Sequence, residues 1–167
     1  MDATQPSITR VLFVCLGNIC RSPLAQGVLE ALVAEQGQKA NFVIESAGIE
    51  GYHAGEAPDI RAQQIAVEYG IDISQQKARK IQARDFTNFD YILAADLSVF
   101  EALKSTQPHN TTAVVKLFLS YLPGHEEDPQ VPDPYYGGMA DFEAVLQLTL
   151  EGCKAFYGML DSRSLTT

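Results

Sequence analysis

The chain has 167 residues, a length typical of one domain with a substantial core, and 46% of its residues are hydrophobic. Its formal net charge of −9 argues against nucleic acid or an anionic membrane as the main partner. No apolar run approaches the roughly 20 residues of a membrane-spanning helix, residues 1–10 do not resemble a signal sequence, and the three cysteines make no disulfide framework. We therefore expect a cytoplasmic protein that forms a single domain over residues 1–167.

Predicted strands and helices alternate along the chain. Apolar runs predict strands at residues 9–14, 41–47, 89–95 and 112–118, and the unbroken run in the first is typical of a central strand buried on both faces. Apolar residues at helical spacing predict helices at 22–37, 59–69, 97–104 and 141–160, the third of them capped by Asp96. The alternation predicts an α/β fold, with a four-stranded parallel sheet, right-handed crossovers and helices on both faces.

The loop between the first strand and the first helix has the composition of an oxyanion site. Backbone N–H groups that curl around an anion at a helix N-terminus can bind several of its oxygens. Gly17 and Asn18 are residue types that tolerate a left-handed conformation in such a loop. The guanidinium of Arg21 can hold two phosphate oxygens, and Ser22 can either cap the helix or hydrogen-bond a thiolate. We infer that this loop binds a phosphoryl group.

Cys15 stands at the junction of the first strand and this loop. A helix N-terminus and a nearby cation both favour the thiolate form of a cysteine, which is the nucleophilic form. A cysteine after an apolar run is more often a buried structural residue. Here the Gly-Asn and Arg-Ser-Pro segments that follow it favour catalysis, so we predict that Cys15 attacks the bound phosphorus.

The run Cys-Leu-Gly-Asn-Ile-Cys-Arg-Ser-Pro from Cys15 to Pro23 resembles the signature loop of the low-molecular-weight protein tyrosine phosphatases. The resemblance extends over about residues 9–160 and implies the fold of that family. It also implies hydrolysis of phosphotyrosine in proteins and of small aryl phosphates through a cysteinyl-phosphate, without a cofactor or metal. Inorganic phosphate would be product and competitive ligand. Arg21 would bind the phosphate together with loop residues Leu16, Gly17, Asn18, Ile19, Cys20 and Ser22.

A second segment, Val-Pro-Asp-Pro-Tyr-Tyr-Gly-Gly, places Asp133 between two prolines. The prolines stiffen the backbone and exclude a helix there. Such an aspartate alone is usually a turn residue, but the segment resembles the acid-bearing loop of the same phosphatase family. The resemblance implies that Asp133 protonates the leaving phenolate and then acts as the base for the hydrolytic water.

Three tyrosines are candidates for the walls of a substrate pocket. Tyr135 and Tyr136 follow the predicted acid, and Tyr52 lies in a glycine-rich loop after the second strand, where it could form the opposite wall. Leu16 or Ile19 would supply an apolar rim. Stacking of a substrate ring on such a wall contributes about 1 kcal/mol beyond area burial. The alternative is that these tyrosines are ordinary half-buried residues.

The other cysteines and the histidines have less specific signals. The resemblance implies that Cys20 can form a reversible disulfide with Cys15, which would protect the nucleophile from irreversible oxidation. We expect Cys153 to lie in the core, and the spacing of the two loop cysteines is poorly suited to zinc. We expect the histidines to be solvated loop residues: His53, His109 and His125.

One position departs from the family pattern. Gln76 stands where many relatives have a histidine that joins the network bracing the loop asparagine. A glutamine can both donate and accept hydrogen bonds, so the brace can survive. The departure leaves open how firmly this chain holds three side chains: Asn18, Ser22 and Ser46.

Three alternative functions can be weighed against particular residues. Related arginine phosphatases tend to carry threonine at the position of Ile19 and lack the tyrosine pair, so the present residues favour an aromatic ester. Arsenate reductases of similar fold relay a disulfide through additional cysteines, and this chain has none between Cys20 and Cys153. A non-enzymatic phosphate-binding or redox-sensing module would keep the loop but lose the arginine or the acid, and both are present.

Overall fold

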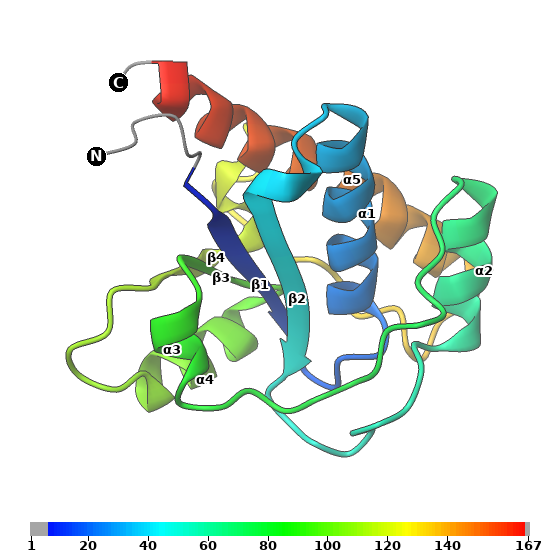
Figure 1. The fold of residues 1–167 in the computed structure, drawn as a ribbon. Coiled ribbons are helices and arrows are strands. Elements are labelled where there is room, and N and C mark those ends of the chain that lie inside the picture. Colours follow the sequence, from blue (N-terminus) through cyan, green and yellow to red (C-terminus); the bar gives the residue numbers. More distant parts are fainter. Residues whose placement is uncertain (1–6, 166–167) are drawn as a thin grey trace.

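The computed structural model describes residues 7–165 (Figure 1). The predicted domain also includes residues 1–6 and 166–167, which lie outside the described residues. The elements in chain order are β1 (Thr9–Cys15), α1 (Arg21–Glu35), η1 (Lys39–Asn41), β2 (Phe42–Gly48), α2 (Ile60–Glu68), α3 (Asp85–Asn88), β3 (Tyr91–Ala94), α4 (Leu97–Thr106), β4 (Val114–Leu117), η2 (Phe118–Tyr121) and α5 (Met139–Leu165).

The strands form one parallel sheet in the order β2–β1–β3–β4. β1 pairs over its whole length with β2, so that Cys15 lies beside Gly48 at the end of both strands. On its other side, β1 pairs with β3 from Val11 to Val14, and the side chains of these residues are at most 2% exposed. The predicted four-stranded parallel sheet and the central position of the first strand are confirmed.

Helices cover both faces of the sheet, as predicted. Figure 1 shows α1, α2 and α5 on one face and α3 and α4 on the other. Side chains alternate along β1, so Val11 and Phe13 enter the core under α1 and α5, whereas Leu12 and Val14 enter the core on the other face. Because both faces of β1 are packed, the loop that leaves its end starts from a fixed point.

Most element boundaries differ from the sequence pattern by one or two residues, and three differences have a clear physical reason. β4 ends before the predicted limit because Phe118 begins the 3-10 turn η2 and packs edge-on against Phe13, with ring centroids 5.3 Å apart. α5 extends beyond both predicted ends, by Met139 and Ala140 at its start and by a mostly polar turn after residue 160, and neither addition is long enough to show apolar periodicity. The short helix α3 was not predicted, since four residues are too few for a periodic pattern to be visible.

The carboxyl ends of the parallel strands meet at one edge of the sheet, where ligands bind in open α/β folds. The loop from Leu16 to Cys20 leaves β1 there, and Asp96 follows β3 at the same edge. The long connection of residues 49–59 after β2 lies beside them. Within residues 7–165, no helix has a stretch suited by length and apolarity to crossing a membrane.

Candidate active site

The loop from β1 to α1 contains one residue in the left-handed conformation. That residue is Asn18, with φ of 60°, whereas the backbone of Gly17 does not have a positive φ. A β-carbon at Gly17 would lie 3.2 Å from Cδ2 of His53, so a larger residue there would require this side chain to shift by a few tenths of an ångström. Both residue types suit the left-handed position, and the structure assigns it to Asn18, whose short polar side chain tolerates it.

The side chain of Asn18 braces the loop from behind. Its Nδ2 donates to the Oγ of Ser22 at 2.8 Å and to the Oγ of Ser46 at 2.9 Å. Its Oδ1 accepts from the backbone N–H of Arg79 at 2.9 Å, and Ser46 donates onward to Gln26. Asn18 is buried, so these bonds are shielded from water and hold the loop in one conformation.

Gln76 takes no part in this network. Its Nε2 donates to the backbone carbonyl of Pro23 at 3.1 Å, and its Oε1 has no hydrogen-bond partner in the described part of the chain. The Asn18 side chain has partners for both its nitrogen and its oxygen without Gln76, because the backbone N–H of Arg79 donates to its Oδ1. The departure at Gln76 therefore does not leave the loop asparagine unbraced.

Cys15 and Ser22 face each other across the loop. The Sγ of Cys15 lies 3.0 Å from the Oγ of Ser22. α1 has no side-chain hydrogen bond at its N-cap, which is Cys20. Of the two roles considered for Ser22 in the sequence, the structure therefore favours contact with the cysteine sulfur over capping of the helix.

Arg21 is buried, with 5% of the residue exposed. Its Nη1 donates to Oδ2 of Asp96 at 2.7 Å and to the carbonyl of Val131 at 3.0 Å, and its Nη2 lies 3.7 Å from Oδ2 of Asp133. Burial disfavours the charged guanidinium, but Cys15 and Asp96 outweigh burial and raise the pKa of Arg21. The arginine is thus held charged and in one orientation.

Asp96 has a second role that its sequence context did not reveal. As predicted, it caps α4, with Oδ1 accepting from the N–H of Val99 at 2.8 Å. Its other oxygen forms the ion pair with Arg21. The available signal was its position directly after a strand next to β1, at the same edge of the sheet as Cys15.

Asp133 reaches the site from a segment far along the chain. The segment is anchored at Val131, whose N–H donates to the carbonyl of Ala95 at 2.8 Å and whose carbonyl accepts from Arg21. The carboxylate of Asp133 accepts from the N–H of Tyr135 at 3.1 Å, and 44% of the side chain is exposed. Its position near Arg21 and open to water suits a group that exchanges protons.

These segments enclose a pocket of about 230 Å³. The structure brings together there nearly all the predicted site residues, while Asn18 and Ser22 lie behind the loop and hold it. The lining residues are Cys15, Leu16, Gly17, Ile19, Cys20, Arg21, Tyr52, His53, Asp133, Tyr135 and Tyr136.

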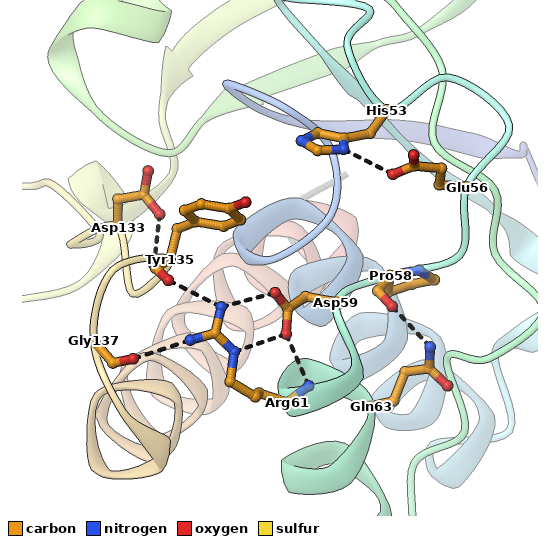
Figure 2. A network of polar contacts seen from close by, with 9 residues as sticks. All are labelled: His53, Glu56, Pro58, Asp59, Arg61, Gln63, Asp133, Tyr135 and Gly137. Atoms are coloured by element: carbon orange, nitrogen blue, oxygen red, sulfur yellow. Dashed lines mark hydrogen bonds and ion pairs between the residues drawn. The ribbon is translucent and has the colours of Figure 1, made fainter.

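The tyrosines project around the mouth of the pocket. Tyr136 is 95% exposed and Tyr52 is 75% exposed, whereas Tyr135 is partly covered and meets Tyr136 edge-on at 4.9 Å between centroids. His53 also lines the pocket, and its Nδ1 lies 2.7 Å from Oε2 of Glu56 (Figure 2). The sequence pattern predicted a solvated loop residue here, because nothing in the neighbours of this histidine indicates which way the loop folds.

The comparisons with known proteins agree with this geometry. The family model for low molecular weight phosphotyrosine protein phosphatase matches residues 10–165. This chain belongs to that family. The low molecular weight phosphotyrosine protein phosphatase of Sus scrofa is 44% identical in an alignment of 152 residues that covers 87% of this chain and 92% of the relative. The family consists of protein tyrosine phosphatases, which are hydrolases.

Two solved structures show the same fold. YfkJ from Bacillus subtilis has a TM-score of 0.88 and 36% identity, covering 95% of this chain and 98% of that one. A Drosophila arginine phosphatase has a TM-score of 0.84 and 35% identity, covering 90% of this chain and 96% of that one.

The cysteines of this phosphatase lie in different environments. All three are free thiols. Burial, with the nearby charge of Asp59, raises the pKa of Cys20 to about 12, and burial alone raises the pKa of Cys153. Cys20 and Cys153 therefore remain protonated at neutral pH. Within residues 7–165, no three His, Cys, Asp or Glu side chains are grouped as ligands of a metal ion. The implied disulfide between Cys15 and Cys20 stays a prediction.

The difference between the thiols predicts selective alkylation. We expect iodoacetamide at pH 7.5 to label Cys15 in the reduced protein and to leave Cys20 unlabelled, because its raised pKa keeps it a neutral thiol. Peptide mass mapping measures the labelling, and excess inorganic phosphate should protect Cys15. In the Cys15→Ser variant, label on Cys20 at this pH would contradict the prediction.

The ion pair of Arg21 with Asp96 predicts a loss of activity without a loss of the helix cap. Asparagine caps helices as well as aspartate does, so Asp96→Asn should keep the cap of α4, whereas the buried charge of Arg21 left without its carboxylate should lower the melting temperature. Without the carboxylate, Arg21 loses its orienting partner, and we expect kcat/KM to fall about tenfold or more, which is about 1.4 kcal/mol. The control Asp96→Ala should show the same kinetic loss and an additional destabilisation of about 1 kcal/mol. Wild-type kcat/KM in Asp96→Asn would contradict the prediction.

Proposed function

We propose that this protein hydrolyses phosphotyrosine in proteins through a cysteinyl-phosphate intermediate. Cys15 is the nucleophile, Arg21 binds the phosphate, and Asp133 is the general acid and then the general base. The observation that carries the proposal is the convergence of these three side chains on one pocket, although the chain separates Asp133 from Arg21 by more than a hundred residues. Membership of the phosphatase family supports the same reaction.

The binding step uses the loop that follows β1. In the proposed binding mode, its backbone N–H groups surround the phosphate above Cys15, and the loop conformation that this needs is held by Asn18. One nitrogen of Arg21 is occupied by Asp96 and Val131. Its Nη2, which is 3.7 Å from Asp133, is turned toward the pocket and is the donor for a phosphate oxygen.

In the first chemical step, the Cys15 thiolate attacks phosphorus. A sulfur–phosphorus bond forms and the phosphorus–oxygen bond to the tyrosine breaks. The hydroxyl of Ser22, 3.0 Å from the sulfur, donates a hydrogen bond that stabilises the thiolate before attack. Asp133, in its protonated form, gives its proton to the departing phenolate oxygen.

In the second step, water releases the phosphate from the enzyme. The carboxylate of Asp133, now charged, accepts a proton from water as the oxygen attacks phosphorus, and the sulfur–phosphorus bond breaks. The exposure of the Asp133 side chain gives this water access to it. Cys15 returns as a thiolate, and inorganic phosphate leaves as product and competitive ligand.

Aromatic side chains at the pocket mouth favour a phosphotyrosine substrate. The rings of Tyr135, Tyr136 and Tyr52 stand around the opening, and Ile19 lines the pocket below them. Stacking against such rings contributes about 1 kcal/mol for an aryl ester and nothing for an alkyl one. Phosphoarginine is the second candidate, because a solved relative at 35% identity is a Drosophila arginine phosphatase.

The direct test is hydrolysis of phosphotyrosine, phosphoserine and phosphoarginine with a chelator and no added metal. We expect turnover of phosphotyrosine well above the other two, because only its ring reaches the tyrosines at the pocket mouth. Preference for phosphoarginine would overturn the role given to these tyrosines and Ile19. In the control Cys15→Ser, calorimetry should still detect phosphate binding while turnover disappears. Residual turnover there would exclude the covalent mechanism, and a wild type that binds phosphate without turnover would indicate a binding module.

The role of Asp133 predicts a dependence on the leaving group. For Asp133→Ala, we expect kcat/KM, which covers only the steps through transfer of the phosphoryl group to Cys15, to fall about 100- to 10,000-fold on phenyl phosphate, because phenolate needs a proton to depart. The loss on 2,4-dinitrophenyl phosphate should be much smaller, since that leaving group is stable as an anion. Steady-state kinetics on a series of aryl phosphates measures the slope. An equal loss across the series would assign the acid elsewhere.

A further inference from the structure

The start of α2 carries an ion pair that is not part of the pocket lining. Asp59 is the N-cap of α2, and its Oδ1 accepts from the backbone N–H of Arg61 at 2.8 Å. The two side chains also form a bidentate ion pair: Nε of Arg61 donates to Oδ1 of Asp59 at 3.0 Å, and Nη2 of Arg61 donates to Oδ2 of Asp59 at 2.9 Å. Figure 2 shows this bidentate pair between α2 and the segment of Asp133. The helix start therefore fixes the guanidinium in one plane.

The remaining donors of Arg61 reach across to the backbone that follows Asp133. Nη2 donates to the carbonyl of Tyr135 at 2.9 Å, and Nη1 donates to the carbonyl of Gly137 at 3.0 Å. The N–H of Tyr135 in turn donates to the carboxylate of Asp133. Figure 2 shows the continuous path from Asp59 through Arg61 and Tyr135 to the carboxylate of Asp133.

The same pair is also joined to the phosphate-binding loop. The backbone N–H of Asp59 donates to the carbonyl of Ile19 at 2.8 Å. The segment of residues 131–137 is thus anchored on both sides of Asp133. Arg21 holds it at Val131, before the acid, and Arg61 holds it at Tyr135 and Gly137, after the acid.

The surroundings of Arg61 favour a fixed guanidinium. Its Cζ lies 4.5 Å from the ring centroid of Phe142 in α5 and 5.8 Å from that of Tyr135. Hydrogen bonding with Arg61 lowers the pKa of Asp59, so this carboxylate stays charged over the pH range of a phosphatase assay. A lysine would supply neither the planar face nor the fork of donors that reach Asp59 and two carbonyls at once.

We propose that Arg61, held by Asp59, is a positioning residue that fixes the carboxylate of Asp133 over the phosphate-binding loop. The proposal rests on the general-acid role proposed above for Asp133. Arg61 does not line the pocket, so it contributes through the geometry of the acid segment rather than through binding of phosphate. Its loss should therefore resemble a weakened form of the loss of Asp133.

The test compares Arg61→Met with wild type on aryl phosphates of different leaving groups. We expect kcat/KM on phenyl phosphate to fall tenfold or more and kcat/KM on 2,4-dinitrophenyl phosphate to change less than threefold, since kcat/KM excludes the second step that all substrates share. The inhibition constant for inorganic phosphate should stay within about twofold. Arg61→Lys should fail to restore the rate, and Asp59→Asn, which keeps the helix cap, should lose activity with the same leaving-group pattern.

Two controls separate positioning from loss of folding. Arg84→Met removes an exposed arginine beside α3, away from the pocket, and should have wild-type kinetics. The double variant Arg61→Met with Asp133→Ala should be no slower than Asp133→Ala alone, because the first change acts only through the second residue. Equal losses on both substrates in Arg61→Met, or a further loss in the double variant, would overturn the proposal.

The result also distinguishes this proposal from the one on which it rests. If Asp133→Ala itself shows no dependence on the leaving group, the general-acid role fails first. If Asp133→Ala shows the dependence and Arg61→Met does not, the general-acid role stands and the positioning role of Arg61 is wrong.

Discussion

The guanidinium of Arg21 joins three parts of the chain that are otherwise distant. Arg21 is the first residue of α1. Its guanidinium donates hydrogen bonds to Asp96, which follows β3, and to the carbonyl of Val131, which lies just before Asp133. A buried guanidinium without such partners would be costly, so the fold must supply the carboxylate of Asp96 and the carbonyl of Val131. The bonds that satisfy this one buried charge hold the segment of Asp133 beside the loop that follows β1.

The local field around this arginine explains how an acidic chain can bind an anionic substrate. The formal net charge of −9 opposes long-range attraction of a phosphate ester. In the proposed binding mode, a phosphate at contact distance would meet the fixed guanidinium and the backbone N–H groups of the loop. Asn18, through its bonds to Ser22, Ser46 and Arg79, holds this loop in one conformation. The proposed binding would therefore depend on preorganised geometry rather than on net charge.

Much of the fold and of the site could be predicted from the residues. Apolar runs and helical spacing predicted the four strands, their parallel pairing and the helices on both faces. The loop from Cys15 to Ser22 is contiguous, so its chemistry could be inferred from the order of its residues alone. The contributions of Asp96, Arg61 and His53 could not. Asp96 follows β3, Arg61 lies in the first turn of α2, and His53 lies in the loop after β2. The same residue types are common as helix caps or solvated side chains.

The sequence by itself determined the elements and the loop, because hydrophobic periodicity and loop composition are local properties of the chain. Only the tertiary structure decided which carboxylate pairs with Arg21, which residue of the loop takes the left-handed conformation, and how the segment after Asp133 is anchored. These depend on distances between residues separated by dozens of positions, and such distances arise only when parallel strands bring their ends to one edge of the sheet.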